Sequence, residues 1–135
     1  NAVTRYERAD YVAIDETELR VATLDKYGRI PELSESVRDR MKVKTFLVSR
    51  GAMGSVVLTA AGWHEAPAVA RRVVDRVGAG DALFAVTSPC AFRDVPPDLL
   101  CFIGNCVGAL AVEIVGNREP VDPVKLFKFI ETLLK

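Results

Sequence analysis

Short apolar runs alternate along the first half of this chain with segments whose apolar residues recur at helical spacing. Residues 11–14 and 45–49 are apolar runs of strand length, whereas residues 16–26 and 32–42 show the helical pattern. Strands that alternate with helices are typical of a sheet whose faces the helices cover. The pattern therefore predicts a layered α/β domain with a mainly parallel sheet.

The second half extends this pattern with a hairpin, an extended stretch and three helices. Asp15 is the expected N-cap of the first helix, and Gly28 lies beyond its end. A helix over 98–115 is almost entirely apolar, so we expect it to be central and buried. The other expected elements are paired strands at 54–59 and 62–66, an extended stretch at 67–77, a helix at 78–92 kinked at Pro89, and a terminal helix at 123–135.

A glycine turn precedes the helix expected at 78–92. Gly78, Ala79 and Gly80 lead directly to Asp81. The first N–H groups of a helix have no partner within the helix and lie at the positive end of its dipole, which makes them an anion site. Two interpretations stay open for this turn: a phosphate site with a carboxylate beside it, or an ordinary helix start.

Two common glycine motifs do not match this turn. A P-loop requires Lys followed by Ser or Thr after its last glycine, but Asp81 and Ala82 stand there. The dinucleotide-binding motif requires Gly or Ala where the chain has Leu83. The turn therefore belongs to neither class.

Size and charge exclude several classes of protein. The chain has 135 residues, of which 50% are hydrophobic, so we expect one domain, at residues 3–135, with Asn1 and Ala2 as a candidate tag remnant. Its 18 basic and 18 acidic residues balance, and no apolar run reaches membrane-spanning length, which argues against nucleic acid and membrane partners. Three cysteines without metal-ligand spacing, and no signal peptide, indicate free thiols in a cytoplasmic protein.

Four stretches in a fixed order resemble a known family. Residues 75–81 resemble the motif Asp-Thr-x-Gly-Ala-Gly-Asp, residues 15–18 resemble Asn-x-x-Glu, residues 48–54 resemble Thr-x-Gly-x-x-Gly, and residues 105–116 resemble an adenine-side helix. Together they resemble the C-terminal half of the PfkB/ribokinase family of carbohydrate kinases. The resemblance implies a ribokinase-like layered fold, mainly parallel, with the N-terminal half and lid missing.

The resemblance also implies roles for individual residues. Asp81 would be the base that takes the proton of the accepting hydroxyl, and the N–H groups of Gly78, Ala79 and Gly80 would stabilise the transferred phosphoryl group. The remaining implied roles are Mg²⁺ binding through water at Asp15 and Glu18, ATP contacts at Ser49, Gly51, Gly54 and Asn105, and a monovalent cation such as K⁺ at Asp75 and the Val77 carbonyl.

Each role has a structural alternative. Asp15 and Glu18 could stabilise only the helix start, and residues 49–54 could form only a strand end and turn. Asn105 could bridge helices, Asp75 could shape its turn, and Arg71, Arg72 and Arg76 could form a solvated edge rather than bind phosphate.

The chain also departs from the family pattern. Arg76 replaces the usual Thr, and Asp15 replaces Asn, which adds negative charge beside the metal. Residues 116–120 lack the polar side chains often seen at the potassium site, which puts that site in doubt.

The leading hypothesis is the ATP-binding and catalytic half of a carbohydrate kinase that phosphorylates a sugar hydroxyl and is inactive in isolation. Residues 9–16 and 103–110 further resemble kinase domains of sugar-nucleotide and heptose pathways. The alternatives are a non-catalytic nucleotide-binding or structural module, and a nucleoside or vitamin-precursor kinase. The acceptor cannot be read from these residues. A missing half would expose a sheet edge, so self-association through that edge is also expected.

Overall fold

The computed structural model describes residues 3–70 and 72–135. Asn1 and Ala2, the candidate tag remnant, lie outside the described residues. Arg71, which was expected either to bind phosphate or to belong to a solvated edge, lies outside them as well.

The described residues form one four-stranded mixed sheet. Its strands are β1 (Tyr11–Asp15), β2 (Thr45–Ser49), β3 (Ser55–Thr59) and β4 (Gly62–Ala66), in the order β1-β2-β3-β4. Only β1 and β2 pair in parallel, whereas β2–β3 and β3–β4 are antiparallel. The sheet is therefore mixed rather than mainly parallel. The connections from β2 to β4 are short turns, and a parallel pairing would need a much longer crossover.

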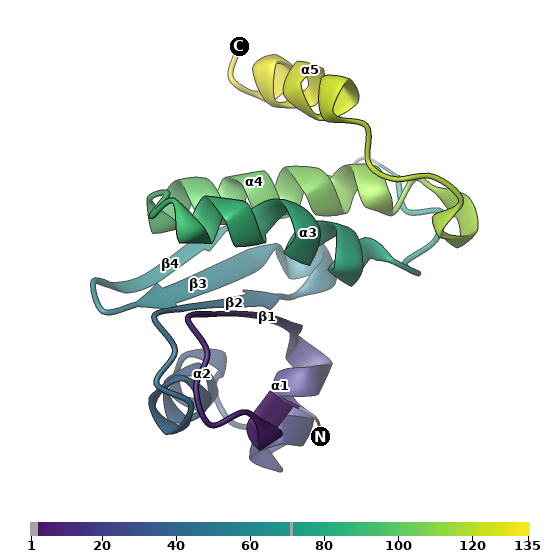
Figure 1. The fold of residues 1–135 in the computed structure, drawn as a ribbon. Helices are drawn as coiled ribbons and strands as arrows, with labels where there is room; N and C mark the ends of the chain where they lie inside the picture. Colours follow the sequence, from purple (N-terminus) through teal and green to yellow (C-terminus); the bar gives the residue numbers. More distant parts are fainter. Residues whose placement is uncertain (1–2, 71) are drawn as a thin grey trace.

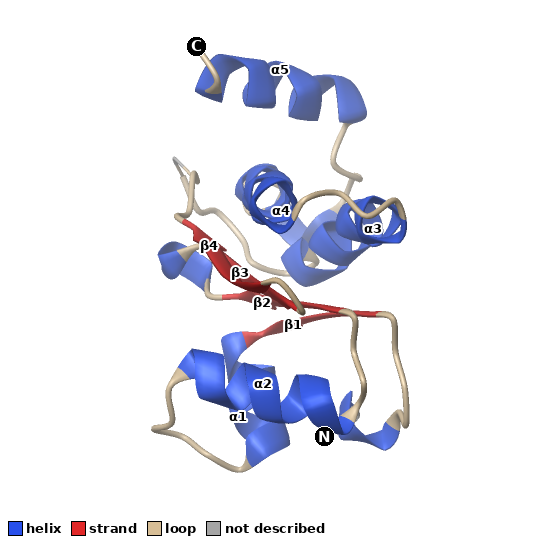
Figure 2. Ribbon diagram, turned by 90° about the vertical axis from the view of Figure 1, so that its left-hand side faces the viewer, coloured by secondary structure: helices blue, strands red, loops and turns tan. Residues whose placement is uncertain are grey.

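Helices cover both faces of the sheet (Figures 1 and 2). One pair packs below the sheet in Figure 1, a second pair packs above it, and the last helix lies against the second pair. These helices are α1 (Glu16–Thr23), α2 (Ile30–Arg40), α3 (Ala79–Phe92), α4 (Pro97–Ala111) and α5 (Pro123–Leu133). Three short 3₁₀ turns complete the fold: η1 (Val3–Arg5), η2 (Gly51–Met53) and η3 (Val115–Asn117).

Four helices end earlier than the sequence pattern predicts. Helix α2 stops at Arg40 instead of residue 42, and α5 stops at Leu133 instead of residue 135. Helix α1 stops at Thr23 instead of residue 26 because Leu24 adopts a left-handed conformation, with φ of 54°. Helix α4 stops at Ala111 instead of residue 115, where the N–H groups of Glu113 and Ile114 bond three residues back and tighten the last turn. Helix α2 begins at Ile30, two residues before the predicted start.

Alternating strand residues divide the core between the two faces, as the pleat requires. Phe46 and Val48 pack toward α1 and α2, whereas Leu47 packs with Leu83 and Leu100 on the opposite face. Most of α4 is buried, as expected of an apolar helix.

The three cysteines are free thiols, as expected. Burial raises the pKa of both Cys101 and Cys106 to about 11. No helix in the described part of the chain is long and apolar enough to span a membrane.

Candidate active site

The carboxyl ends of β1 and β2 bring two predicted site residues together. Asp15 and Ser49 are paired in the parallel register at these ends. The N-terminus of α3 approaches from the other side, and a pocket of about 280 Å³ opens between these elements. Its lining includes five predicted site residues, Asp15, Glu18, Ser49, Gly80 and Asp81, together with Ala13, Ile14, Leu83 and Phe84.

Asp15 and Glu18 cap α1 while they line this pocket. Asp15 Oδ1 accepts the Glu18 backbone N–H at 2.8 Å, and Glu18 Oε2 accepts the Asp15 backbone N–H at 3.0 Å. This reciprocal pair is a capping box, so the helix-stabilising interpretation is realised. The same contacts hold both carboxylates at the pocket wall.

The glycine turn opens α3 as predicted. Gly78 occupies the N-cap in a left-handed conformation, with φ of 80°. The Ala79 N–H donates to the Arg76 carbonyl at 3.3 Å, which occupies one of the three expected anion donors. Within the described residues, the N–H groups of Gly78, Gly80 and Asp81 have no acceptor. Two of the three predicted donors, Gly78 and Gly80, are therefore available to an anion, together with the N–H of Asp81.

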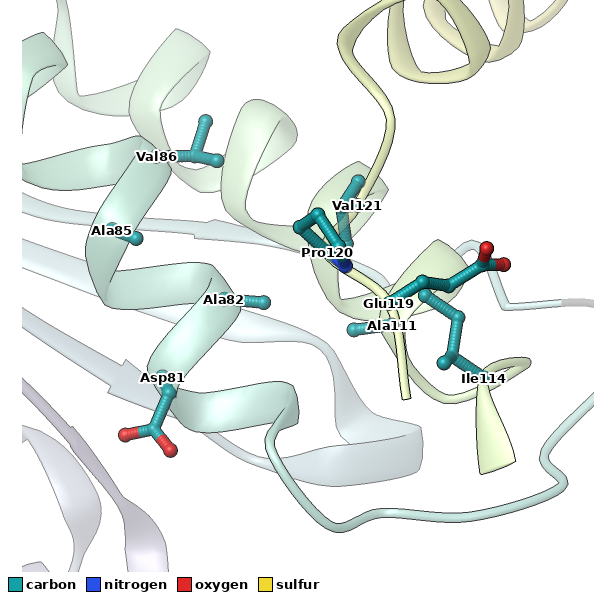
Figure 3. Close-up of a pocket in the computed structure, with 9 residues that line it drawn as sticks. All are labelled: Asp81, Ala82, Ala85, Val86, Ala111, Ile114, Glu119, Pro120 and Val121. Carbon is teal, nitrogen blue, oxygen red and sulfur yellow. The ribbon is translucent and has the colours of Figure 1, made fainter. Parts of the chain in front are cut away.

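A second pocket, of about 240 Å³, lies on the other side of α3 (Figure 3). Small apolar side chains of α3 and the end of α4 line it, together with Glu119, Pro120 and Val121. Asp81 belongs to this lining too, but its carboxylate points away from the loop that carries Pro120, whereas Ala82 points toward that loop. The orientation of Asp81 thus favours the first pocket as the place for its chemistry.

Ser49 lines the first pocket at the end of β2, whereas Gly51 and Gly54, in the turn that follows, lie outside the pocket lining. The Arg50 N–H donates to the Gly54 carbonyl at 2.7 Å and closes the turn. Gly54 has φ of 84°, and a Cβ there would lie 2.1 Å from the Ala66 carbonyl oxygen. Gly54 is therefore required by backbone packing. Gly51 is exposed, with φ of 55°, and an added Cβ would meet no atom within 4 Å.

Asn105 is engaged with backbone away from both pockets. Its amide nitrogen donates to the carbonyls of Ala66 and Pro67, each at 2.9 Å. The side chain therefore fastens the segment after β4 to α4, which is close to the bridging alternative. Its contact with adenine stays a prediction.

Asp75 ties the segment before α3 to the chain beyond α4. Its two carboxylate oxygens accept the N–H groups of Val77, at 3.0 Å, and Gly116, at 2.8 Å. These backbone hydrogen bonds lower the pKa of Asp75 below its ordinary value. These two contacts realise the turn-shaping interpretation of Asp75. The assignment of a monovalent cation to Asp75 and the Val77 carbonyl stays a prediction.

A cluster of charged residues beside the pocket was not expected from the sequence. Glu16 accepts from Arg20 at 2.8 and 3.0 Å and from Arg50 at 3.3 Å. Burial alone would raise the pKa of Glu16, but the hydrogen bonds from both arginines lower it below its ordinary value. The spacing of Glu16 and Arg20 by four residues is a helical signal, whereas nothing local indicates the pairing with Arg50.

The first pocket offers two carboxylates, those of Asp15 and Glu18, to a magnesium ion whose other ligands would be water and substrate phosphates. The described residues contain no group of three or more His, Cys, Asp or Glu side chains placed to bind a metal ion. Mg²⁺ usually keeps several waters and takes only one or two carboxylates besides substrate phosphates. Asp15 and Glu18 fit such a partial shell.

Comparisons with known proteins agree with this architecture. The bifunctional protein HldE of Shewanella sediminis is 29% identical over 130 residues, which cover 93% of this chain and 27% of HldE. Ribokinase from Thermotoga maritima superposes with a TM-score of 0.80 at 18% identity, over 90% of this chain and 42% of that structure. Aminoimidazole riboside kinase from Salmonella enterica, complexed with its riboside and an ATP analogue, gives 0.76 at 27% identity, over 95% and 44%.

These relatives define both the fold and the extent of the match. The fold is ribokinase-like, and the chain spans less than half the length of each of these proteins. The pfkB family of carbohydrate kinases matches residues 3–123, nearly the whole chain. The chain belongs to the pfkB family of carbohydrate kinases.

Proposed function

We propose that this chain supplies the ATP site, the anion-stabilising turn and the base for phosphoryl transfer to a hydroxyl of a sugar or sugar derivative. The observation that carries the proposal is the first pocket, where Asp81 and the Gly80 backbone face Asp15, Glu18 and Ser49. Phosphoryl transfer depends mainly on positioning and on stabilising negative charge, and these residues are suited to both.

Each side chain has a distinct part in this proposal. Asp81 accepts the proton of the attacking hydroxyl. The N–H groups of Gly80 and Asp81, at the positive end of α3, stabilise negative charge on the transferred group. Ser49 contacts the nucleotide phosphates, and Asp15 and Glu18 orient the metal and its waters. Magnesium, when bound, neutralises charge on the phosphates.

ATP is the proposed donor, and a sugar derivative is the proposed acceptor. The complex of aminoimidazole riboside kinase with an ATP analogue supports the choice of donor. The resemblance of residues 9–16 and 103–110 to heptose-pathway kinase domains favours a sugar over a nucleoside or vitamin precursor.

We also propose that further polypeptide completes the site along β1. In the described chain β1 pairs only with β2, so its other edge is open. Helix α3 carries Asp81 as its single charged residue, and it exposes Phe84 and Phe92 by 49% and 86%. Covering this apolar surface would exclude water from the pocket, which transfer to a sugar rather than to water requires. The isolated chain should therefore transfer phosphate poorly and should self-associate through this surface, which sedimentation velocity would detect.

The decisive experiment replaces Asp81 by Asn in protein that includes the covering polypeptide. Loss of a general base should lower the transfer rate by about 10²- to 10⁴-fold while the affinity for ADP and Mg²⁺ is retained. Asp98→Asn, in the first turn of α4, is the matched control and should leave turnover unchanged. Turnover retained by the Asp81 variant would refute the base assignment, whereas nucleotide binding with no turnover in the unaltered protein would favour the non-catalytic module.

A further inference from the structure

The charged cluster beside the pocket joins the two segments that extend past the ends of β1 and β2. Glu16 is the first residue of α1, and Arg50 is the first residue after β2. Arg50 Nε donates to Glu16 Oε2 at 3.3 Å, and the two side chains are only 21% and 31% exposed. This shielding distinguishes the pair from a solvated surface ion pair.

Each end of this ion pair is held firmly. The Arg50 N–H donates to Gly54, and the Arg50 carbonyl accepts the Met53 N–H at 3.0 Å, so its backbone belongs to the closed turn. Arg20 holds the other Glu16 oxygen, and its guanidinium also donates to the Lys26 carbonyl at 2.9 Å. The ion pair therefore connects the closed turn after β2 to the first residue of α1.

The ladder between β1 and β2 ends at the pair of Asp15 and Ser49. Glu18 and Gly51 lie beyond that point, where no strand pairing sets their separation. A nucleotide that uses the turn for its phosphates and the α1 carboxylates for its metal needs both segments at one spacing. The Glu16–Arg50 ion pair connects the start of α1 to the turn after β2 just beyond the end of the strand ladder.

We propose that Glu16 and Arg50 are positioning residues that set the spacing between the metal-binding carboxylates of α1 and the phosphate-binding turn after β2. This inference rests on the proposed nucleotide site. The two side chains do not line the pocket, so they act through the positions of Glu18 and of the turn at Gly51, which lie beyond the strand ladder, rather than by contact with the ligand.

The test measures ADP binding by calorimetry at a series of Mg²⁺ concentrations. Glu16→Gln and Arg50→Gln should each raise the half-saturating Mg²⁺ concentration by about tenfold, the size of coupling between contacting side chains. The double variant should lose no more than either single variant, because one interaction is removed in all three. Arg50→Lys keeps the positive charge, so its half-saturating Mg²⁺ concentration should stay close to that of the unaltered protein.

Controls separate positioning from stability. Arg29→Gln and Glu32→Gln break an exposed ion pair on α2 and should leave the Mg²⁺ dependence unchanged. A lower thermal midpoint with unchanged Mg²⁺ dependence in the folded Glu16 and Arg50 variants would overturn the inference. If the unaltered protein binds no ADP at any Mg²⁺ concentration, the proposed function fails together with the inference. If the unaltered protein and all variants bind ADP with the same Mg²⁺ dependence, the inference is refuted and the proposed function stands.

Discussion

Replacement of Gly54 by Ala should destabilise the protein far more than other glycine replacements. The backbone at Gly54 has φ of 84° and ψ of −141°, a region that residues with a Cβ rarely enter, at a cost of about 1–3 kcal/mol. The new Cβ would also lie 2.1 Å from the Ala66 oxygen and 2.7 Å from the Ala68 nitrogen. These are backbone atoms, and Asn105 holds this segment on α4. Overpacking against such atoms adds about 1–3 kcal/mol, so we expect a total of about 4 kcal/mol.

Urea unfolding followed by circular dichroism measures this loss. Gly62→Ala is the matched control, since Gly62 also has a positive φ, of 120°, but no atom lies within 4 Å of an added Cβ. Only the backbone strain, about 1–2 kcal/mol, should remain in that variant. A Gly54→Ala variant as stable as Gly62→Ala would show that the segment after β4 yields easily, and the packing explanation would be wrong.

Two further changes probe titrating groups. Asp75→Asn should lower the free energy of unfolding at neutral pH and make it fall less steeply in acid. Because the pKa of Asp75 is depressed in the folded protein, its carboxylate stabilises the fold at pH values above the ordinary pKa of 3.8. That contribution disappears as falling pH protonates the carboxylate, which accepts the N–H groups of Val77 and Gly116. Acid unfolding curves of both proteins check this, and parallel curves would contradict it. Tyr11→Phe removes a 2.7 Å hydrogen bond to Thr87, at a cost of about 1 kcal/mol at neutral pH. Because burial raises the Tyr11 pKa from 10.0 to about 12, the unaltered protein should lose stability more steeply between those pH values than the variant, as urea midpoints would show.

Local patterns in the sequence were sufficient for most elements and for part of the site. The hairpin of β3 and β4 follows from alternation around a two-residue turn, and the N-cap role of Asp15 follows from its position before a helical pattern. Asp15 and Ser49 could be expected to meet because the carboxyl ends of parallel strands share one edge of a sheet.

Features that depend on distant contacts could not be predicted in the same way. Arg50 meets Glu16 across 34 residues, and Asn105 meets Ala66 across 39, with no periodicity to indicate either contact. The prediction of a mainly parallel sheet was wrong for a different reason. The apolar pattern of a buried strand is the same in parallel and antiparallel sheets, and only the shortness of the connection from β2 distinguishes them.

The parallel pairing of β1 and β2 determines where insertions can accumulate in evolution without moving Asp15 and Ser49 apart. Asp15 and Ser49 are neighbours in a hydrogen-bonded ladder, so the separation of these two residues depends on the sheet rather than on any loop. Insertions at the turn between β3 and β4, or in the loop from η3 to α5, would leave this distance intact. Loops and covering segments could therefore diverge, while the geometry that places Ser49 beside Asp15 is inherited unchanged.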